Sequence, residues 1–153
     1  MNASLQRDRL ILVDSEGHAI GEGDKAKCHQ GQGIPHRAIS VYIWDEDGKV
    51  LIQKRSANKL LWPSYWSNSY CSHPHPGEST LEAAKRRFAE ELTLAHDFVL
   101  REDFSYLYQA QYLEVGSEYE YCTVFSMTLE NSLKQKILGE AVEVEELRWI
   151  NPS

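Results

Sequence analysis

The sequence predicts an α/β chain of the α+β kind, in which a mixed β-sheet is packed between helices. Most apolar segments are short and rich in β-branched and aromatic residues, as strands are. One strongly amphipathic helix lies in the middle of the chain and a weaker one follows late, an order that favours a sheet with helices packed on it. A length of 153 residues suits one domain, 1–153, with a single core.

The composition is acidic and narrows the range of partners. Lysine and arginine number 16 and aspartate and glutamate 23, so the formal net charge is -7, which argues against a nucleic-acid or membrane surface. No apolar run approaches the roughly 20 residues of a membrane span, and the polar start 1–8 lacks the apolar core of a secretory signal. We therefore expect a cytoplasmic protein, monomeric or homodimeric, without nucleic-acid or membrane partners.

Four short extended segments open the chain and form two predicted hairpins. Turn signals at 15–17 and 45–48, each ending in glycine, separate the members of each pair. The polar segment Gly23–His36 between the hairpins is expected to be a long ordered loop, and such loops tend to be functional. The predicted strands are 10–14, 19–22, 38–44 and 49–54.

The stretch Trp62–Glu78 organises the rest of the chain. It packs two tryptophans, a cysteine, two histidines, three prolines and a glycine into 17 positions, a composition that indicates a site. Ser79 and Glu82 form a capping box, so a helix is predicted over Ser79–Leu92. The alternative is a loop packed on its tryptophans beside an exposed, salt-bridged helix. The buried face of the helix is predicted to hold Leu81, Ala84, Phe88 and Leu92.

The last third of the chain predicts two further strands, a short helix and a final strand. The strands are rich in tyrosine, phenylalanine and valine, and Gly139 follows the helix as a stop signal. In order, these elements span 103–110, 118–127, 131–138 and 142–150.

Three cysteines, Cys28, Cys71 and Cys122, are odd in number and far apart, which argues against a disulfide framework. Cys28 lies outside any ligand spacing such as C-x-x-C, and Cys122 sits in a strand pattern, so both are interpreted as packing residues. At least one cysteine is therefore free to react.

Three histidines and two glutamates form a candidate metal site. His29 and His36 lie in the predicted loop, while Glu118 and Glu120, two apart on a predicted strand, project to the same side. With His73 they offer a mixed nitrogen and oxygen donor set that suits zinc, manganese or iron. The alternative is that residues so far apart in the sequence are separate surface groups.

Four basic residues next to the candidate loops suit a diphosphate. Arginine forks and lysine point charges are the usual donors to such groups. Arg87 also stands one helical turn from Glu91, close enough to pair with it. Each of the four could instead be a solvated surface charge. They are Lys25, Arg55, Lys59 and Arg87.

Several motifs resemble the signature of the type I isopentenyl-diphosphate isomerases. The central motif is Asn68–Glu78, and the similarity runs from about Leu10 to Trp149. Several separate motifs at matching spacings are far more specific than one. The others are Trp62-Pro63, Arg86-Arg87 and Glu91-Leu92 around the central motif, then His29, His36–Ala38, Gln53–Ser56 and Glu118–Cys122.

This resemblance implies the Nudix fold, and the Nudix motif can be traced in degenerate form. The motif is a glycine, a glutamate six positions on, then R-E-hydrophobic-x-E-E-x-G-hydrophobic. Glu78 is retained, but Ser72 and Thr93 replace the two glycines, and Arg87 replaces a glutamate. Because Nudix hydrolases use that glutamate on magnesium, its loss argues against hydrolysis.

The resemblance also implies roles for individual residues. Glu91 and the backbone carbonyl of Cys71 would hold Mg2+ on the substrate diphosphate. Cys71 and Glu120 would be the two proton-transfer residues, with Tyr108 assisting the acid, and donor and acceptor are left open between the pair. A second divalent metal, Mn2+ or Zn2+, would be bound by His29, His36, His73, Glu118 and Glu120. The diphosphate contacts would be Lys25, Arg55, Lys59 and Arg87.

The implied reaction converts isopentenyl diphosphate to dimethylallyl diphosphate in isoprenoid biosynthesis, with this small prenyl diphosphate as the partner. One group protonates the alkene to a tertiary carbocation, and another on the opposite face removes a proton from the neighbouring carbon. A water-poor pocket protects the cation, and aromatic faces stabilise it by roughly 0.5–2 kcal/mol each. Trp66, Trp62 and Tyr108 are candidates for that wall, with Trp66 against the substrate.

One departure leaves alternatives open. Family members usually continue past the position of Trp149 into a C-terminal segment that helps cover the site, whereas this chain stops at Ser153. We therefore expect a slow isomerase. The alternatives are a Nudix diphosphohydrolase acting on a prenyl or nucleoside diphosphate, and an inactive module that binds metal or diphosphate.

Overall fold

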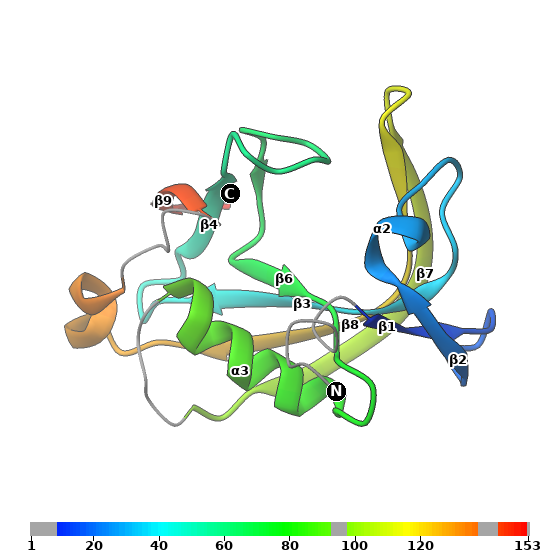
Figure 1. Ribbon diagram of the computed structural model, residues 1–153. Helices are drawn as coiled ribbons and strands as arrows, with labels where there is room; N and C mark the ends of the chain where they lie inside the picture. The colour runs from blue at the N-terminus through cyan, green and yellow to red at the C-terminus, as the bar shows by residue number, and fades with distance from the viewer. Residues whose placement is uncertain (1–8, 93–97, 138–143, 153) are drawn as a thin grey trace.

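In the part of the chain that the structure describes, a curled mixed sheet of nine strands forms the body of the protein, with one long helix packed across it (Figure 1). The computed structural model describes residues 9–92, 98–137 and 144–152, without the side chain of Glu91. No helix in this part of the chain is long and apolar enough to cross a membrane. The prediction of a mixed sheet with helices packed on it is confirmed.

Strand β3, His36–Trp44, is the centre of the sheet. It pairs in parallel with β8, Gly116–Thr128, from His36 opposite Glu120 to Trp44 opposite Thr128. On its other side it pairs antiparallel with β6, Tyr70–Ser72. This arrangement places three segments that are far apart in the sequence side by side.

The remaining strands extend the sheet around this centre. Strand β7 lines the outer edge of β8, β1 and β2 form a hairpin that meets the start of β3, and β4 carries β5 and β9. Their bounds are β1 Arg9–Val13, β2 Ala19–Asp24, β4 Val50–Arg55, β5 Trp66–Ser67, β7 Arg101–Tyr112 and β9 Val144–Ile150.

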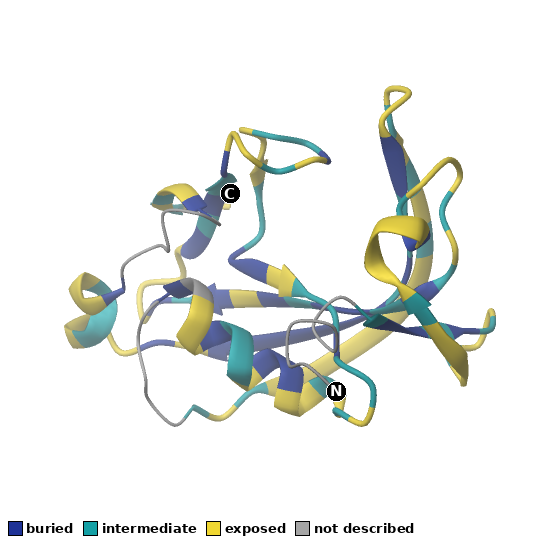
Figure 2. Ribbon diagram, viewed as in Figure 1, coloured by how far each residue is buried: buried dark blue, intermediate teal, exposed yellow. Residues whose placement is uncertain are grey.

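The main core lies between helix α3, Thr80–Leu92, and one face of β3 and β8 (Figure 2). Alternate residues of these strands point toward the helix because successive side chains of a strand face opposite sides. The Tyr70 hydroxyl adds a 2.7 Å hydrogen bond to the Ala84 carbonyl. The fully or nearly fully buried side chains of the cluster include Ile39, Val41, Ile43, Phe125, Ala83, Ala84, Phe88 and Leu92.

The helix agrees with its predicted cap and mostly with its predicted face. The Glu82 amide donates to the Ser79 hydroxyl over 3.1 Å, as the capping motif requires. Ala84, Phe88 and Leu92 are buried, but the placement of Leu81 in the core was wrong, because this side chain is 40% exposed. Ala83, beside Ala84 on the helix, is fully buried in the core instead.

Three segments differ from the prediction, and the first two are more regular than expected. The expected loop Gly23–His36 contains the end of β2 and a short helix α2, Lys25–Cys28, whose first turn is capped by the Asp24 carboxylate. The stretch Trp62–Glu78 includes the short strands β5 and β6. The late helix is a 3-10 helix, η1, over Asn131–Lys136, and the predicted positions 138–139 and 142–143 lie outside the described residues.

Candidate metal and active site

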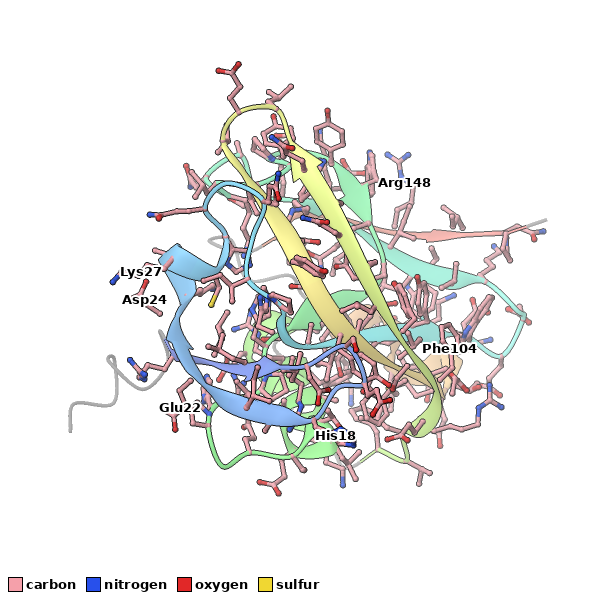
Figure 3. The ribbon with its side chains drawn as sticks, turned by 90° about the vertical axis from the view of Figure 1, so that its right-hand side faces the viewer. His18, Glu22, Asp24, Lys27, Phe104 and Arg148 are labelled. Carbon is pink, nitrogen blue, oxygen red and sulfur yellow. The ribbon has the colours of Figure 1, made fainter. Side chains whose placement is uncertain are left out.

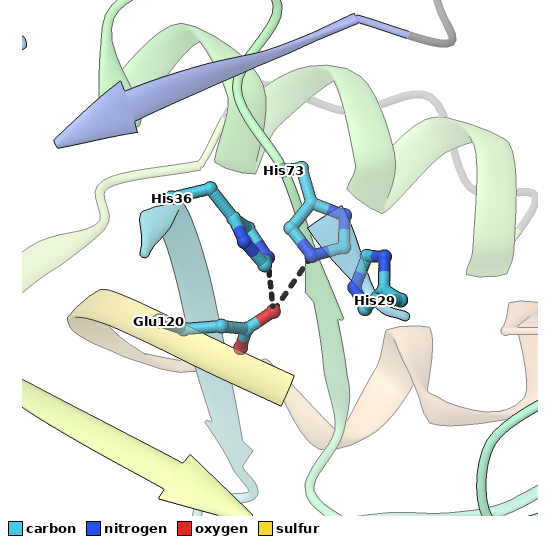
Figure 4. Close-up of side chains that lie close together, drawn as sticks. All are labelled: His29, His36, His73 and Glu120. Atoms are coloured by element: carbon cyan, nitrogen blue, oxygen red, sulfur yellow. Dashed lines mark hydrogen bonds and ion pairs between the residues drawn. The ribbon is translucent and has the colours of Figure 1, made fainter. Parts of the chain in front are cut away.

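Three imidazoles and one carboxylate converge beside the start of β3 (Figure 4). One ligand atom from each of His29, His36, His73 and Glu120 lies within 4.8 Å of the others. Oε2 of Glu120 is 3.1 Å from Nε2 of His36 and 2.7 Å from Nε2 of His73. Such spacing is close enough for a single ion to contact all four side chains.

Each member of the cluster comes from a different element. His29 follows α2, His36 begins β3, His73 follows β6 and Glu120 lies within β8. The parallel register of β3 and β8 places His36 directly opposite Glu120. The four ligands therefore depend on the strand pairing rather than on one local motif.

Backbone carbonyls orient two of the imidazoles. Nδ1 of His29 is 2.7 Å from the Lys25 carbonyl oxygen, and Nδ1 of His36 is 2.7 Å from that of Ile34. A carbonyl can only accept, so these nitrogens carry hydrogen and the Nε2 atoms are left as ligands. This arrangement is typical of histidines that bind metal.

The electrostatics keep His29 and His73 neutral and the carboxylate of Glu120 charged. Burial lowers the pKa of His73 to about 4 and also lowers the pKa of His29. For Glu120, burial acts to raise the pKa, but the ring nitrogens of His36 and His73 beside Oε2 outweigh it and bring the pKa far below its usual value. Neutral imidazoles with one carboxylate form a donor set that fits Zn2+, Mn2+ or Fe2+.

Glu118 lies beside this cluster rather than within it. The Tyr108 hydroxyl lies 2.8 Å from Oε2 of Glu118 and 2.5 Å from Oε1 of Glu120. Burial, together with the charge of Glu120, raises the pKa of Glu118. Because a hydroxyl has one hydrogen, Tyr108 can donate to only one of the two carboxylates at a time. Tyr108 thus couples the two glutamates.

A cavity of about 320 Å³ opens next to the cluster and contains the predicted reactive groups. Cys71, Glu120, Tyr108 and Glu118 line it, so the thiol and the carboxylates face one space. Its volume falls at the lower end of the range for small-molecule sites, roughly 300–1,000 Å³. The aromatic side chains around it are Trp62, Tyr65, Trp66, Tyr106, Tyr108 and Tyr42.

The three cysteines differ in accessibility. None of the three forms a disulfide in the part of the chain that the structure describes; Cys28 and Cys122 are buried and Cys71 is exposed. The expectation that Cys28 and Cys122 are packing residues is consistent with this burial. Burial also raises the pKa of Cys122, which keeps that thiol protonated. Cys71 is therefore the exposed thiol of the cavity, whereas Cys122 lines its wall as a buried residue.

The predicted basic residues are placed unequally. Arg55 lines the cavity, where Nε and Nη2 bond the Leu61 carbonyl over 3.2 and 2.9 Å. Lys25 lies near the metal cluster. Burial is the main cause of the lowered pKa of His29 and His73, and the nearby charge of Lys25 lowers both further. Lys59 is half-buried and is not part of the cavity wall.

Arg87 lies on α3, away from the cavity wall. Its Nη1 atom is 2.6 Å from Oε2 of Glu90, a partner one residue from the predicted Glu91. The side chain of Glu91 is outside the described residues, so the predicted magnesium ligand and the Arg87–Glu91 pair are not described.

The cavity also contains residues that the sequence did not single out. Ser40 and Tyr42 come from β3 and Tyr106 from β7, all on the face that carries Glu120. The Asn68 amide donates to the Ser40 hydroxyl and, over 3.0 Å, to the Tyr70 carbonyl. The sequence could have identified Ser40 and Tyr42, because every second residue of a strand faces the same side and both positions follow His36 at even spacing.

Known proteins share both the sequence and the fold. Residues 34–153 match the NUDIX domain family. Isopentenyl-diphosphate Delta-isomerase 1 of Photorhabdus laumondii is 43% identical over 122 residues, which cover 77% of this chain and 67% of that protein. The isopentenyl-diphosphate Delta-isomerase of Clavibacter sepedonicus is 34% identical over 143 residues, covering 94% of this chain and 73% of that protein.

A crystal structure of a protein from Deinococcus radiodurans has the same fold. It superposes with a TM-score of 0.73 and 19% identity, covering 94% of this chain and 83% of its own. This likeness and the domain match confirm the predicted Nudix fold. The chain belongs to the NUDIX domain family and, within it, groups with the isopentenyl-diphosphate Delta-isomerases.

Proposed function

We propose that this protein interconverts isopentenyl and dimethylallyl diphosphate by proton transfer. The observation that carries the proposal is the shared cavity, in which the exposed thiol of Cys71 and the carboxylate of Glu120 face one space. The names of the relatives in Photorhabdus and Clavibacter support the same reaction. A cavity that served only packing would need neither the Cys71 thiol nor the Glu120 carboxylate.

The chemistry needs two proton carriers and little water. One group delivers a proton to the terminal methylene carbon, and the resulting tertiary carbocation loses a proton from carbon 2 to the other group. Within the substrate, only C–H bonds and the position of the double bond change. Tyr108 is hydrogen-bonded to Glu120 and can hold or return its proton. The aromatic walls, Trp66 among them, exclude water and face the cation.

Metal binding is part of the proposal. A divalent cation held by His29, His36, His73 and Glu120 would supply the positive charge that fixes the Glu120 carboxylate, and Mn2+ or Zn2+ suits this donor set. We extend the ligand set to Glu118, whose carboxylate is joined to Glu120 through Tyr108. Mg2+ is proposed at Glu91 and the Cys71 carbonyl, on the substrate diphosphate.

The diphosphate is proposed to lie at the charged end of the cavity. Arg55 lines the cavity, the charge of Lys25 acts on His29 and His73 beside it, and Lys59 and Arg87 are proposed to act from the rim. Three cysteines without a disulfide among the described residues fit a reducing compartment, which supports a cytoplasmic location. A monomer or homodimer that acts on this small diphosphate alone completes the proposal.

The decisive experiment is incubation with isopentenyl diphosphate in heavy water, following deuterium in the product and phosphate release. We expect deuterated dimethylallyl diphosphate without phosphate, and a rate at least about a thousandfold lower for Cys71→Ala. The matched control is Cys28→Ala, which changes a buried thiol outside the cavity. Phosphate without isomer would instead indicate a diphosphohydrolase, and neither product would indicate a binding module.

A further inference from the structure

Of the four side chains in the metal cluster, His29 depends least on the sheet. It follows the four-residue helix α2 and begins the loop 29–35, whereas the other three lie in a strand or directly after one. Figure 3 shows the molecule from the side of α2, with Asp24, which caps the helix, and Lys27 labelled. A helix of one turn is unstable by itself, so the place of His29 must be set by what the loop contacts.

The loop is held by hydrogen bonds from the β7–β8 hairpin to its carbonyl groups. The Ser117 amide donates to the His29 carbonyl over 2.9 Å, and the Ser117 hydroxyl donates to the Gly31 carbonyl over 2.6 Å. On β7, the side-chain amide of Gln109 donates to the Gln32 carbonyl over 2.6 Å. Ser117 is fully buried, so both of its bonds lie inside the contact between the loop and β8.

Gly116 allows the loop to approach β8 this closely. A Cβ atom at this position would overlap the carbonyl oxygen of His29, a backbone atom that cannot swing aside as the end of a side chain can. Gly116 is buried and its φ lies outside the left-handed region, so space rather than backbone conformation requires glycine here. Any side chain at this position would therefore move the His29 backbone away from the strand that carries Glu120.

The ring of His29 would follow its backbone. Nδ1 of His29 lies 2.7 Å from the Lys25 carbonyl oxygen, and this bond limits how far the ring can turn to compensate for a shift. The ring centroid lies 4.9 Å from that of His36 and 5.4 Å from that of His73. Bonds from zinc to imidazole nitrogen are about 2.0–2.1 Å long and vary by only about 0.2 Å. A shift of about 1 Å is thus enough to remove His29 from the ligand set.

We propose that Gly116 and Ser117 are positioning residues of the metal site, which set its affinity by fixing His29 from the start of β8. The inference rests on the metal binding that forms part of the proposed function. One strand then has two roles, because Glu120 supplies a ligand directly and the start of the strand holds a second ligand in place. Neither positioning residue is part of the ligand cluster or the cavity wall, so each acts through His29.

Titration of the metal-free protein with Co2+ tests the positioning without any turnover. Co2+ accepts nitrogen and oxygen ligands as Zn2+ does, and its visible absorption depends on the ligand geometry. Gly116→Ala should raise the Kd of Co2+ by about 10–100-fold, the range for groups that orient metal ligands, and should alter the absorption band. Ser117→Ala removes only the hydroxyl bond to Gly31, so its Kd should rise by about 2–10-fold.

Two controls separate positioning from a general loss of stability. Gly21→Ala changes another strand glycine, where an added Cβ would only touch Leu12 at an ordinary distance, so the Kd should not change. In a His29→Ala background, Gly116→Ala should raise the Kd no further, because the residue that it displaces is already gone. An additive effect in that background, or a Kd equal to that of the wild type for Gly116→Ala alone, would refute the positioning role. If Gly116→Ala does not fold, Ser117→Ala takes its place under the same criteria.

The heavy-water experiment separates this inference from the proposed reaction. A wild-type protein that forms isomer and binds Co2+, with the same Kd in every variant, would refute the positioning role alone. The expected order of Kd values without isomer formation would refute the isomerase and leave the positioning role supported. A wild-type protein that binds no Co2+ would refute the inference together with the proposed metal site.

Discussion

The two faces of the β3–β8 pair have different roles although they belong to the same strands. On one face, Ile39 and Val41 are fully buried and Phe125 is 2% exposed, all in the core under α3. On the other face, His36 and Glu120 meet at the metal cluster, beside an open cavity. Neighbouring residues of one strand therefore serve stability and chemistry in alternation, and the parity of a position predicts which property its mutation changes.

The comparison also explains how the chemical face tolerates buried polar groups. The side chain of His36 is fully buried and that of Glu120 is 7% exposed. Such burial costs free energy unless the groups are hydrogen-bonded, and here Nδ1 of His36 donates to the Ile34 carbonyl, while Glu120 lies within hydrogen-bond distance of Tyr108 and His73. The apolar face opposite holds the strands in register, so the ligands are positioned before any ion binds.

The largest expected effect is on the chemical face. Glu120→Gln keeps the shape of the side chain but removes the charge and the proton carrier, so kcat should fall by at least about a thousandfold. Bound metal per chain, measured by atomic emission, should fall as well, whereas far-UV circular dichroism should not change. Retention of more than a tenth of the activity would show that the two faces are not divided in this way.

On the core face, Phe125→Ala should give the reverse pattern. Removing this buried ring should lower the free energy of unfolding by about 3–5 kcal/mol in urea denaturation. Activity per folded molecule should be unchanged at low temperature. Phe104→Ala, at an exposed position of β7, serves as the control and should change stability by about 0.5 kcal/mol or less. Loss of activity in correctly folded Phe125→Ala would show that the core face also affects the chemistry.

In the metal-free protein, the histidines of the chemical face should make the free energy of unfolding depend on pH. The pKa of His73 is about 4 in the folded state against 6.5 as its ordinary value, so the unfolded chain binds more protons between these values. Stability should therefore fall by about 1–3 kcal/mol as the pH drops from 6.5 to 4. His29 acts in the same direction, and Glu120 adds to the loss only below its ordinary value of 4.5.

Urea midpoints at several pH values would check this, with His73→Asn as the variant. The slope between pH 6.5 and 4 should be flatter in the variant because one buried neutral imidazole is gone. An identical slope in both proteins would mean that His73 titrates as an ordinary exposed histidine.

The smallest expected effect is at the start of α3, far from both the cavity and the core centre. Ser79→Ala removes the hydroxyl that accepts the Glu82 amide and should cost about 1 kcal/mol of stability. Ser79→Asp should restore it, because aspartate is an equally good cap. Thermal unfolding of the three proteins would measure the difference, and a loss that Asp does not restore would point to packing instead.

Local signals in the sequence determined most of the elements. Strand 38–44 was predicted from its β-branched and aromatic residues, and α3 from the Ser79 cap and the helical spacing of Phe88 and Leu92. These features depend on residues a few positions apart, so they are visible without the rest of the chain. The short helix α2 was missed because four residues are too few to show a periodic pattern.

The assembly of the site was decided only by the tertiary structure. His36 and Glu120 are 84 positions apart, and their contact follows from the parallel register of β3 and β8. A shift of that register by one residue would turn Glu120 toward α3, and packing on both faces rather than local propensity prevents it. The metal role of Glu118 stays a prediction, and in the folded sheet its carboxylate lies in the cavity wall beside Tyr108, which joins it to Glu120.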